Sequence, residues 1–381
     1  MMHFTRREFL IGTLSSLAFS GWSPPSLGNE RTGNIIVILL EGGMDGLAAV
    51  PPIGDNDLFR QRESLVTKSP LYINDFFGLH PSLHSFSELM DQGQAAVVHA
   101  TNIPYTKRSH FEGQNVMETG NLKPFSDKTG WLGRALDEAG LSGKALSLNL
   151  PLLMRGNKEI DTFFPANLKF SSNPNPRISK LLSQTRTGLL SDSFTKLSTK
   201  YSNSISMHSR DPKSLAIHAG TEINKLDGPK AAVLRVKRFD THANQGAEIG
   251  QHFKQLELLN SLFKSLKESL GNAWSKTIIV TLTEFGRTVR ANGSEGTDHG
   301  YASAGFLAGG LLSGTKMLSD WPGLKNSDLY EERDLMATID YRSVLSGCIE
   351  SAFGLSHDLI ANKVFYEPDL PRIPKSIFRL S

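Results

Sequence analysis

Short, continuous runs of apolar residues recur along the chain and predict buried strands. They are residues 34–40, 95–98, 231–236 and 277–282. Such runs are typical of strands that are covered on both faces. Between them lie helical patterns, and the clearest places apolar residues three and four positions apart from Ile249 to Leu270. Because strands and helices alternate, we predict an α/β fold with a doubly wound, mostly parallel sheet and helices on both faces.

One long segment departs from this pattern. Residues 172–221 are rich in Ser, Thr, Asn, Lys and Arg and carry only scattered apolar residues. We interpret this segment as a polar insertion, helical or loop-like, that leaves the sheet and serves as a lid or an oligomer contact. Residues 29–381, which include this insertion, are enough for one large α/β domain or two smaller ones, and we expect a single domain.

The first residues indicate where the protein goes. Residues 5–10, Thr-Arg-Arg-Glu-Phe-Leu, form a twin-arginine pattern, and the apolar stretch that follows ends near Phe19 and is too short to span a bilayer. The segment Ser26-Leu27-Gly28, with small residues at 26 and 28, predicts cleavage before Asn29. An amphipathic N-terminal helix is the alternative. We expect a signal peptide at residues 1–28, recognition by the twin-arginine export machinery, and a periplasmic or secreted protein.

Composition excludes several classes of protein. The net charge is +3, and charged residues make up 21% of the chain. Acidic and basic residues are interspersed, which is not the pattern of a nucleic-acid-binding surface. No segment after residue 30 is apolar enough to cross a membrane. The single cysteine, Cys348, cannot form an internal disulfide, and it stands in a predicted helix at residues 341–353 as a small core residue.

A carboxylate follows the first predicted strand. The segment Glu41-Gly42-Gly43-Met44-Asp45-Gly46 contains glycines that allow a tight turn and would bring Asp45 to the edge of the sheet. Ligands bind at this edge in sheets of this class. A plain turn, in which Asp45 bonds its own backbone, is an equal alternative.

A serine and a histidine follow the second strand, in Ser109-His110-Phe111-Glu112. Ser109 is a candidate nucleophile at the start of a helix, with His110 and Arg108 beside it. Ser-x-x-Glu is also a capping box, in which the two side chains only satisfy free amides of the first turn, and the local pattern favours this reading. The two roles are compatible, because a helix N-terminus also favours a bound anion.

Two further acid–imidazole pairs follow later strands. Asp240 and His242 stand after residues 231–236, in a loop where both can reach one ion. Asp298 and His299 lie in a glycine-containing loop that permits close approach of the backbone to a bound group.

The fourth strand ends at Glu284, and Arg287 lies three residues on, where it can pair with Glu284 or hold a substrate oxyanion. The remaining histidines lack acidic neighbours of this kind, and we expect structural roles for them. Crowded Asp, Glu and His side chains at strand ends are the donors that divalent metals need. The candidate metal ligands are therefore Asp45, Asp240, His242, Glu284, Asp298 and His299, and the candidate catalytic residues are Ser109, His110 and Arg287.

Together with the twin-arginine leader, five motifs resemble an exported bacterial family known as domain of unknown function 1501. They are Gly42-Gly43-Met44-Asp45-Gly46-Leu47, residues 109–114, residues 239–245, residues 283–288 and Thr297-Asp298-His299-Gly300. The resemblance extends to about Leu355. The family looks like a distant branch of the alkaline phosphatase and sulfatase superfamily, which implies an α/β core with one or two divalent ions, zinc, manganese, magnesium or calcium, at the strand ends.

The resemblance also implies roles for individual residues. Asp45 resembles the first-strand acidic ligand, although Glu41 lies closer to the strand. Ser109 resembles the position of the superfamily's nucleophile. Asp240 and His242 resemble ligands of one metal, and His299 resembles the last histidine ligand, which Asp298 can orient. Phe285 stands where a further histidine is expected, so one imidazole is missing.

The implied chemistry is hydrolysis of a phosphate or sulfate ester. In this reading a metal activates Ser109 or a water molecule, and Arg287, Arg108 or Lys107 holds the oxygens of a small anionic substrate. The main alternative is an exported binding or assembly protein that keeps the fold and one metal without catalysis. A metal-free serine hydrolase is a weaker alternative, because the chain has no Gly-x-Ser-x-Gly elbow.

Overall fold

The predicted apolar runs form the centre of a single sheet in the computed structural model, which describes residues 32–146, 150–162 and 211–379. β1 (Asn34–Leu40) is buried along its whole length. It pairs in parallel with β7 (Ala231–Val236) on one side and with β8 (Thr277–Leu282) on the other. These strands contain mainly Ile, Val, Leu and Ala, because both of their faces are covered.

The sheet is mostly parallel. Its order is β10-β4-β9-β8-β1-β7-β5-β6, with β11 paired to β4. β9 (Ser303–Ala308) is antiparallel to both β8 and β4 (Ala95–Asn102), so β4 runs in the same direction as β1, β7 and β8. The edge strands are short: β5 (Gly143–Ala145), β6 (Ile160–Thr162), β10 (Met317–Leu318) and β11 (Ile339–Asp340). β2 (Leu71–Tyr72) and β3 (Gly78–Leu79) form a separate hairpin.

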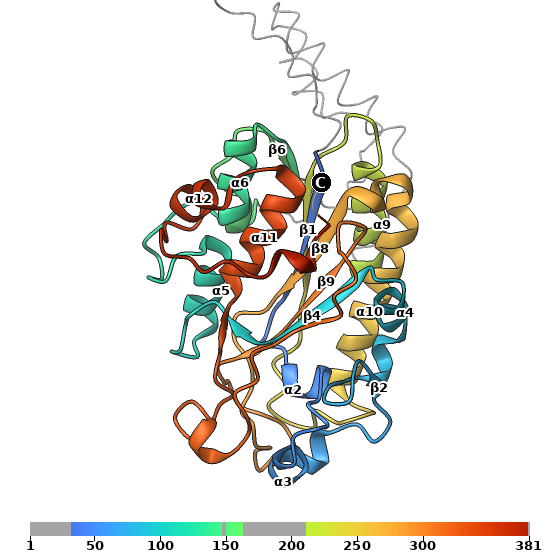
Figure 1. Ribbon diagram of the computed structural model, residues 1–381, viewed down its shortest axis with the longest axis vertical. Helices are drawn as coiled ribbons and strands as arrows, with labels where there is room; N and C mark the ends of the chain where they lie inside the picture. Colours follow the sequence, from blue (N-terminus) through green and yellow to red (C-terminus); the bar gives the residue numbers. More distant parts are fainter. Residues whose placement is uncertain (1–31, 147–149, 163–210, 380–381) are drawn as a thin grey trace, which may run out of the picture. The chain divides into compact units, whose positions relative to one another are not determined.

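Helices cover both faces of the sheet (Figure 1). Alternate residues of β1 point to opposite sides, so Ile35, Val37 and Leu39 belong to one apolar core, and the residues between them belong to the other. The first core is covered by α5 (His110–Thr119), α6 (Trp131–Ala139) and α11 (Tyr341–Phe353). The second is covered by α4 (His84–Asp91), α9 (Pro212–Ile223) and α10 (Gln251–Leu270).

Short helical segments complete the described chain. The α-helical ones are α2 (Gly46–Ala49), α3 (Asp57–Arg62) and α12 (His357–Leu359). The 3-10 turns are η1 (Glu63–Leu65), η2 (Pro81–Leu83), η3 (Leu152–Met154), η4 (Gly271–Lys276), η5 (Asn326–Asp328) and η7 (Lys375–Ile377), and η6 (Ile360–Val364) is a π-helical turn.

The sheet direction gathers the predicted functional segments at one edge. β1, β4, β7 and β8 all point the same way, so the segments that follow them leave from their shared carboxyl edge. β9 runs in the opposite direction, so the loop that precedes it, residues 293–302, arrives at this same edge. This is where doubly wound sheets bind their ligands.

The structure confirms the predicted fold class, with differences of detail. The second strand extends to Asn102, past the apolar run. The helix expected from Ile249 begins at Gln251, and Ile249 itself is exposed. β9 is an additional antiparallel strand. Cys348 is buried in α11, as predicted. None of the described helices is long and apolar enough to cross a membrane.

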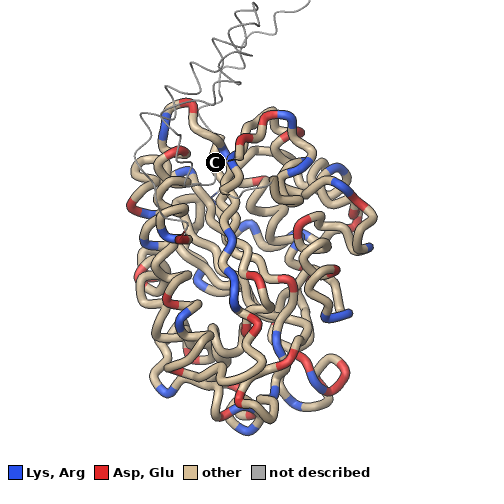
Figure 2. Tube along the Cα trace, turned by 180° about the vertical axis from the view of Figure 1, so that it is seen from behind, with Lys and Arg blue, Asp and Glu red and all other residues tan. Residues whose placement is uncertain are grey.

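Two predicted features lie largely outside the described residues. The export signal at residues 1–28 lies entirely outside them, as does the polar insertion up to residue 210. The end of the insertion is described and belongs to α9, whose Asp211 caps the helix by accepting from the amides of Lys213 and Ser214. Basic and acidic residues are interspersed along the described chain (Figure 2), as expected from the sequence.

A buried histidine makes the fold sensitive to acid. His99 lies in β4 with no exposed surface, its Nε2 is 2.9 Å from the Val50 carbonyl oxygen, and its Nδ1 accepts from the amide of Ala100 at 2.7 Å. A proton added to Nδ1 would therefore face a donor. Burial lowers the pKa of His99 to about 4, although the hydrogen bond to the Val50 carbonyl and the charge of Asp45 act to raise it.

We predict that the free energy of unfolding falls as the pH drops from 6.5 towards 4, because in that window the unfolded chain binds a proton at His99 that the folded protein does not. His99 alone should contribute about 2 kcal/mol to this loss at pH 5, and His99→Gln should remove that contribution. His252, whose pKa burial also lowers to about 4, contributes separately and keeps its contribution in this variant. Urea unfolding at pH 7 and pH 5 measures it. His84→Gln, at an exposed histidine, is the control and should leave the pH dependence unchanged.

Candidate metal centre

Three side chains from distant parts of the chain meet at the carboxyl edge of the sheet. His110 is the first residue of α5, Asp240 lies in the loop after β7, and His299 lies in the loop before β9. One ligand atom from each lies within 4.8 Å of the other two. Asp240 is central, since its Oδ1 is 3.1 Å from His299 Nε2 and its Oδ2 is 3.4 Å from His110 Nε2.

Hydrogen bonds on the far side of each ring determine which nitrogen faces Asp240. His110 Nδ1 lies 2.9 Å from Glu284 Oε1, and His299 Nδ1 lies 2.9 Å from the carbonyl oxygen of Arg108. Both partners are acceptors, so we assign the proton of each neutral ring to Nδ1, which leaves a lone pair on Nε2. Two imidazole lone pairs and a carboxylate thus converge, and such an arrangement requires a proton or a metal cation among them.

Glu284 holds His110 from behind. Its Oε1 also accepts from the amide of Gly42 at 2.9 Å and from the side-chain amide of Gln114 at 3.2 Å. Burial raises the pKa of Glu284, but these hydrogen bonds, with that of His110 first, outweigh burial and lower it. The same hydrogen bond raises the pKa of His110. The structure therefore places Glu284, a predicted metal ligand, behind the His110 ring rather than among the three converging atoms.

His242 and Asp298 lie on the outer side of the cluster. His242 Nε2 is 3.0 Å from Asp240 Oδ1 and 3.1 Å from His299 Nε2, and His242 Nδ1 is 3.1 Å from Asp298 Oδ1. About half of each of these two side chains is exposed, at 47% and 49%. His242 can thus add a fourth donor, with Asp298 orienting its ring.

Arg287 is buried beneath Asp240 and does not pair with Glu284. Its side chain has no exposed surface, and its Nη1 donates to Asp240 Oδ1 at 2.7 Å and to the Gly42 carbonyl at 3.2 Å. Its Nε donates to Thr297 Oγ1 at 3.1 Å, and its Nη2 donates to the Thr297 carbonyl. Burial raises the pKa of Asp240, but Arg287, together with His242 and His110, outweighs burial and lowers it. In this arrangement Arg287 positions a ligand instead of facing a substrate.

The acidic residues after β1 are placed apart from the three converging atoms. Asp45 is buried as the N-cap of α2, where it accepts from the amide of Ala48 at 3.1 Å, forms an ion pair with Arg62, and accepts from Gln245 Nε2 at 2.6 Å. Glu41 pairs with Arg235. Each carboxylate thus has its own arginine.

The predicted capping box at the start of α5 is wrong. Ser109 is the N-cap residue by its backbone, but its side chain makes no capping hydrogen bond. Glu112 does not reach back to it, because Glu112 Oε2 accepts from the Tyr105 hydroxyl at 3.1 Å. Tyr105 also accepts from the Ser109 amide at 3.1 Å. The Tyr105 hydroxyl thus takes the place of the predicted capping box. Ser109, which directly precedes His110, makes no capping hydrogen bond with its hydroxyl.

The two cations before Ser109 are paired with carboxylates. Arg108 donates to Asp334 at 2.8 Å and to Glu331 at 2.6 Å. Lys107 Nζ is 3.8 Å from Glu112 Oε2, and the Lys107 side chain is exposed. Because the Arg108 carbonyl accepts from His299, these ion pairs also fix the ring of a candidate ligand.

Phe285 packs against the cluster from within the core. Its ring centroid is 4.9 Å from that of His110 and 4.7 Å from that of His299. The family resemblance implies a histidine at position 285, where this chain has Phe. His110 supplies an imidazole to the same cluster from α5. The sequence predicts a catalytic role for His110. Its place at a helix start beside a strand end was the signal for a ligand role.

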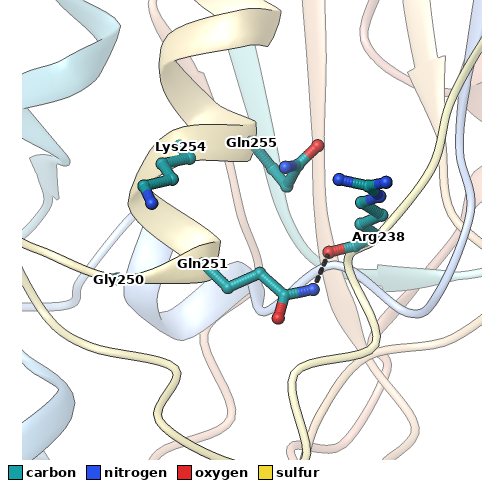
Figure 3. A pocket seen from close by; sticks show the side chains of 5 residues that line it. All are labelled: Arg238, Gly250, Gln251, Lys254 and Gln255. Carbon is teal, nitrogen blue, oxygen red and sulfur yellow. Dashed lines mark hydrogen bonds between the residues drawn. The ribbon is translucent and has the colours of Figure 1, made fainter.

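A surface recess lies at the N-terminus of α10, apart from the candidate ligands. Figure 3 shows its lining residues, Arg238, Gly250, Gln251, Lys254 and Gln255, and the hydrogen bond of 3.0 Å from Gln251 to the Arg238 carbonyl. The recess has no carboxylate, histidine or nucleophile in its lining. The candidate chemistry therefore belongs to the cluster around Asp240.

Comparison with known families identifies a relationship for the C-terminal part of the chain. Residues 224–364 match the model of a family described as "Protein of unknown function (DUF1501)". This match confirms the predicted family resemblance. It includes Asp240, His242, Glu284 and His299, whereas His110 and Ser109 precede it. No curated protein matches the chain.

Several solved structures are similar in fold at low identity. A crystal structure of Ps i-CgsB in complex with k-i-k-neocarrahexaose is 12% identical, with a TM-score of 0.45, covering 86% of this chain and 73% of that chain. A protein in the alkaline phosphatase superfamily from Vibrio parahaemolyticus is 14% identical, with a TM-score of 0.38, covering 73% of this chain and 60% of that chain. The C-terminal periplasmic domain of EcEptC from Escherichia coli, in complex with Zn, is 12% identical, with a TM-score of 0.37, covering 74% of each chain.

We predict that Ser109→Ala changes the free energy of unfolding by less than about 0.5 kcal/mol, because the hydroxyl caps nothing. The comparison variant is Asp211→Ala, which removes a cap that accepts from two amides and should cost about 1 kcal/mol. Urea unfolding at neutral pH measures both. Equal losses in the two variants would contradict the assignment of the Ser109 side chain.

Proposed function

We propose that this protein is an exported, metal-dependent hydrolase of phosphate or sulfate esters. His110, Asp240 and His299 would hold a divalent cation, with His242 as a further donor. The observation that supports this most directly is the convergence of two imidazole Nε2 atoms on the two oxygens of Asp240, at 3.4 and 3.1 Å. Each ring is held with its Nδ1 on an acceptor.

The donor set fits a borderline metal. Imidazole nitrogen together with carboxylate oxygen is typical of zinc and manganese sites, whereas magnesium and calcium prefer oxygen alone. Within the described chain, His110 Nε2 is buried and makes no hydrogen bond, so its lone pair is available to a metal. Glu284 and Arg108 orient the two rings from behind, as such supporting groups do in metal sites.

The proposed roles follow from position. When bound, a divalent cation would lower the pKa of a coordinated hydroxyl group or water molecule and would withdraw charge from an ester oxygen. Ser109, which directly precedes His110 and is free of a capping bond, is the proposed nucleophile. Arg287 would keep Asp240 ionised and in place. A small anionic ester is the proposed substrate class.

A second candidate is a non-catalytic exported protein that binds one metal. The observation that favours it is that the three cations expected to hold substrate oxygens are all paired with carboxylates: Arg287 with Asp240, Arg108 with Asp334, and Lys107 with Glu112. The metal-free serine hydrolase receives less support, because both ring nitrogens of His242 and of His299 already have partners other than Ser109. For either candidate, the twin-arginine leader supports a periplasmic or secreted location.

We predict that the purified chain binds zinc or manganese and that His299→Gln weakens this binding at least about 10-fold, because one of three converging donors is lost. Isothermal titration calorimetry with each metal alone, after chelator treatment, measures it. His84→Gln is the control, since His84 is exposed and distant in sequence from every candidate ligand. Absence of binding by the unaltered protein to zinc, manganese, magnesium and calcium would refute the metal site.

Turnover separates the two candidates. We expect the metal-loaded protein to hydrolyse 4-nitrophenyl phosphate or 4-nitrophenyl sulfate, and Ser109→Ala to reduce kcat by at least about 100-fold with metal affinity unchanged. Ser126→Ala, at an exposed serine elsewhere, is the control. Tight metal binding with no turnover of a broad panel of phosphate and sulfate esters would favour the binding protein.

A further inference from the structure

Gln245 lies at the junction of the segments that carry the candidate ligands. It has no exposed surface. Its Oε1 accepts from the hydroxyl of Thr241 at 2.8 Å and from that of Thr297 at 2.7 Å, and its Nε2 donates to Asp45 Oδ2 at 2.6 Å. Thr241 adjoins Asp240. One amide group therefore contacts the loop after β7, the loop before β9 and the turn after β1.

The chain of hydrogen bonds continues from Gln245 to the cluster. Thr297 Oγ1, which donates to Gln245, accepts from Arg287 Nε at 3.1 Å, and Arg287 Nη1 donates to Asp240 Oδ1 at 2.7 Å. On the other side of Gln245, Asp45 is anchored by Arg62, whose side chain is fully buried. Each hydroxyl and amide in this chain has its donor and acceptor directions determined by its neighbours, so its members can adopt few other arrangements.

The two ligand loops are also pressed together along their backbones. The backbone amide of Gln245 donates to the Glu295 carbonyl at 3.0 Å, and the backbone amide of Thr297 donates to the Thr241 carbonyl at 3.0 Å. A Cβ on Gly296 would lie 2.3 Å from the carbonyl carbon of His242, so only glycine allows this contact. With the backbones this close, the side chain that lies between the loops sets how the ligands beside it are placed.

We propose that Gln245 is a positioning residue for the candidate metal centre, joining the Asp240 loop to the His299 loop through Thr241, Thr297 and Arg287. This inference rests on the proposed metal site. It also gives Asp45 a role: the carboxylate holds the Gln245 amide in the orientation that leaves Oε1 free to accept from both threonines. Outer-shell groups of this kind typically account for 10- to 100-fold in metal affinity.

The test is metal affinity in Gln245→Met, which keeps the length and approximate volume of the side chain but removes its donor and its acceptor. The expected result is a rise of at least about 10-fold in the Kd for zinc alone, measured by calorimetry on the full mature chain. Gln255→Met, on α10 at the surface recess of Figure 3, is the matched control and should bind zinc as the unaltered protein does.

Measuring the melting temperature of each metal-free variant separates positioning from a general loss of stability. If Gln245→Met does not fold, Thr297→Val takes its place, because it removes the hydroxyl between Gln245 and Arg287 and keeps the shape of the side chain. A Kd within twofold of the unaltered protein, in a folded variant, would overturn the inference and leave the metal site standing. Failure of the unaltered protein to bind metal would overturn both.

Discussion

One buried arginine organises the carboxyl edge of the sheet. A guanidinium keeps its charge throughout the pH range in which proteins fold, so an arginine without solvent exposure must find acceptors for its donors. Arg287 finds them in the Gly42 carbonyl, in the carbonyl and hydroxyl of Thr297, and in the Asp240 carboxylate. These acceptors belong to the segments after β1, before β9 and after β7. Satisfying a single side chain thus draws three distant segments to one point.

The same contact sets the charge balance of the candidate site. Arg287 keeps Asp240 ionised, and Asp240 Oδ1 is also 3.0 Å from His242 Nε2 and 3.1 Å from His299 Nε2. Without a metal, a protonated His110 ring can direct its Nδ1 proton to Glu284 and its Nε2 proton to Asp240. This arrangement agrees with the raised pKa of that histidine. A metal and a proton would occupy the same convergence of lone pairs, so they compete.

The sequence predicted the frame of this site better than its interior. The continuous apolar runs and their alternation with helices were sufficient for the sheet, and parallel strands place Asp240 and Glu284 at one edge whatever the loops do. What each polar group does there depends on partners far away in the sequence. Glu284 looked like a ligand because it ends a strand, but only the fold shows that His110, 174 residues earlier, lies in front of it. Gln245 is the last residue of the motif at residues 239–245, but no local pattern assigns it a role.

The contacts of three acidic residues that look alike in the sequence distinguish their roles. Glu41, Asp45 and Asp240 each follow a strand, and each contacts an arginine, Arg235, Arg62 or Arg287. Asp45 is buried, and its oxygens accept from an amide, a guanidinium and Gln245, so its capacity is filled by the protein. Asp240 is 40% exposed, and both of its oxygens face imidazole nitrogens that carry lone pairs. A carboxylate whose oxygens face only donors is structurally complete. Asp240 accepts from Arg287 but also faces imidazole nitrogens with lone pairs, which a further cation would satisfy, and this difference makes Asp240 the candidate centre of the proposed site.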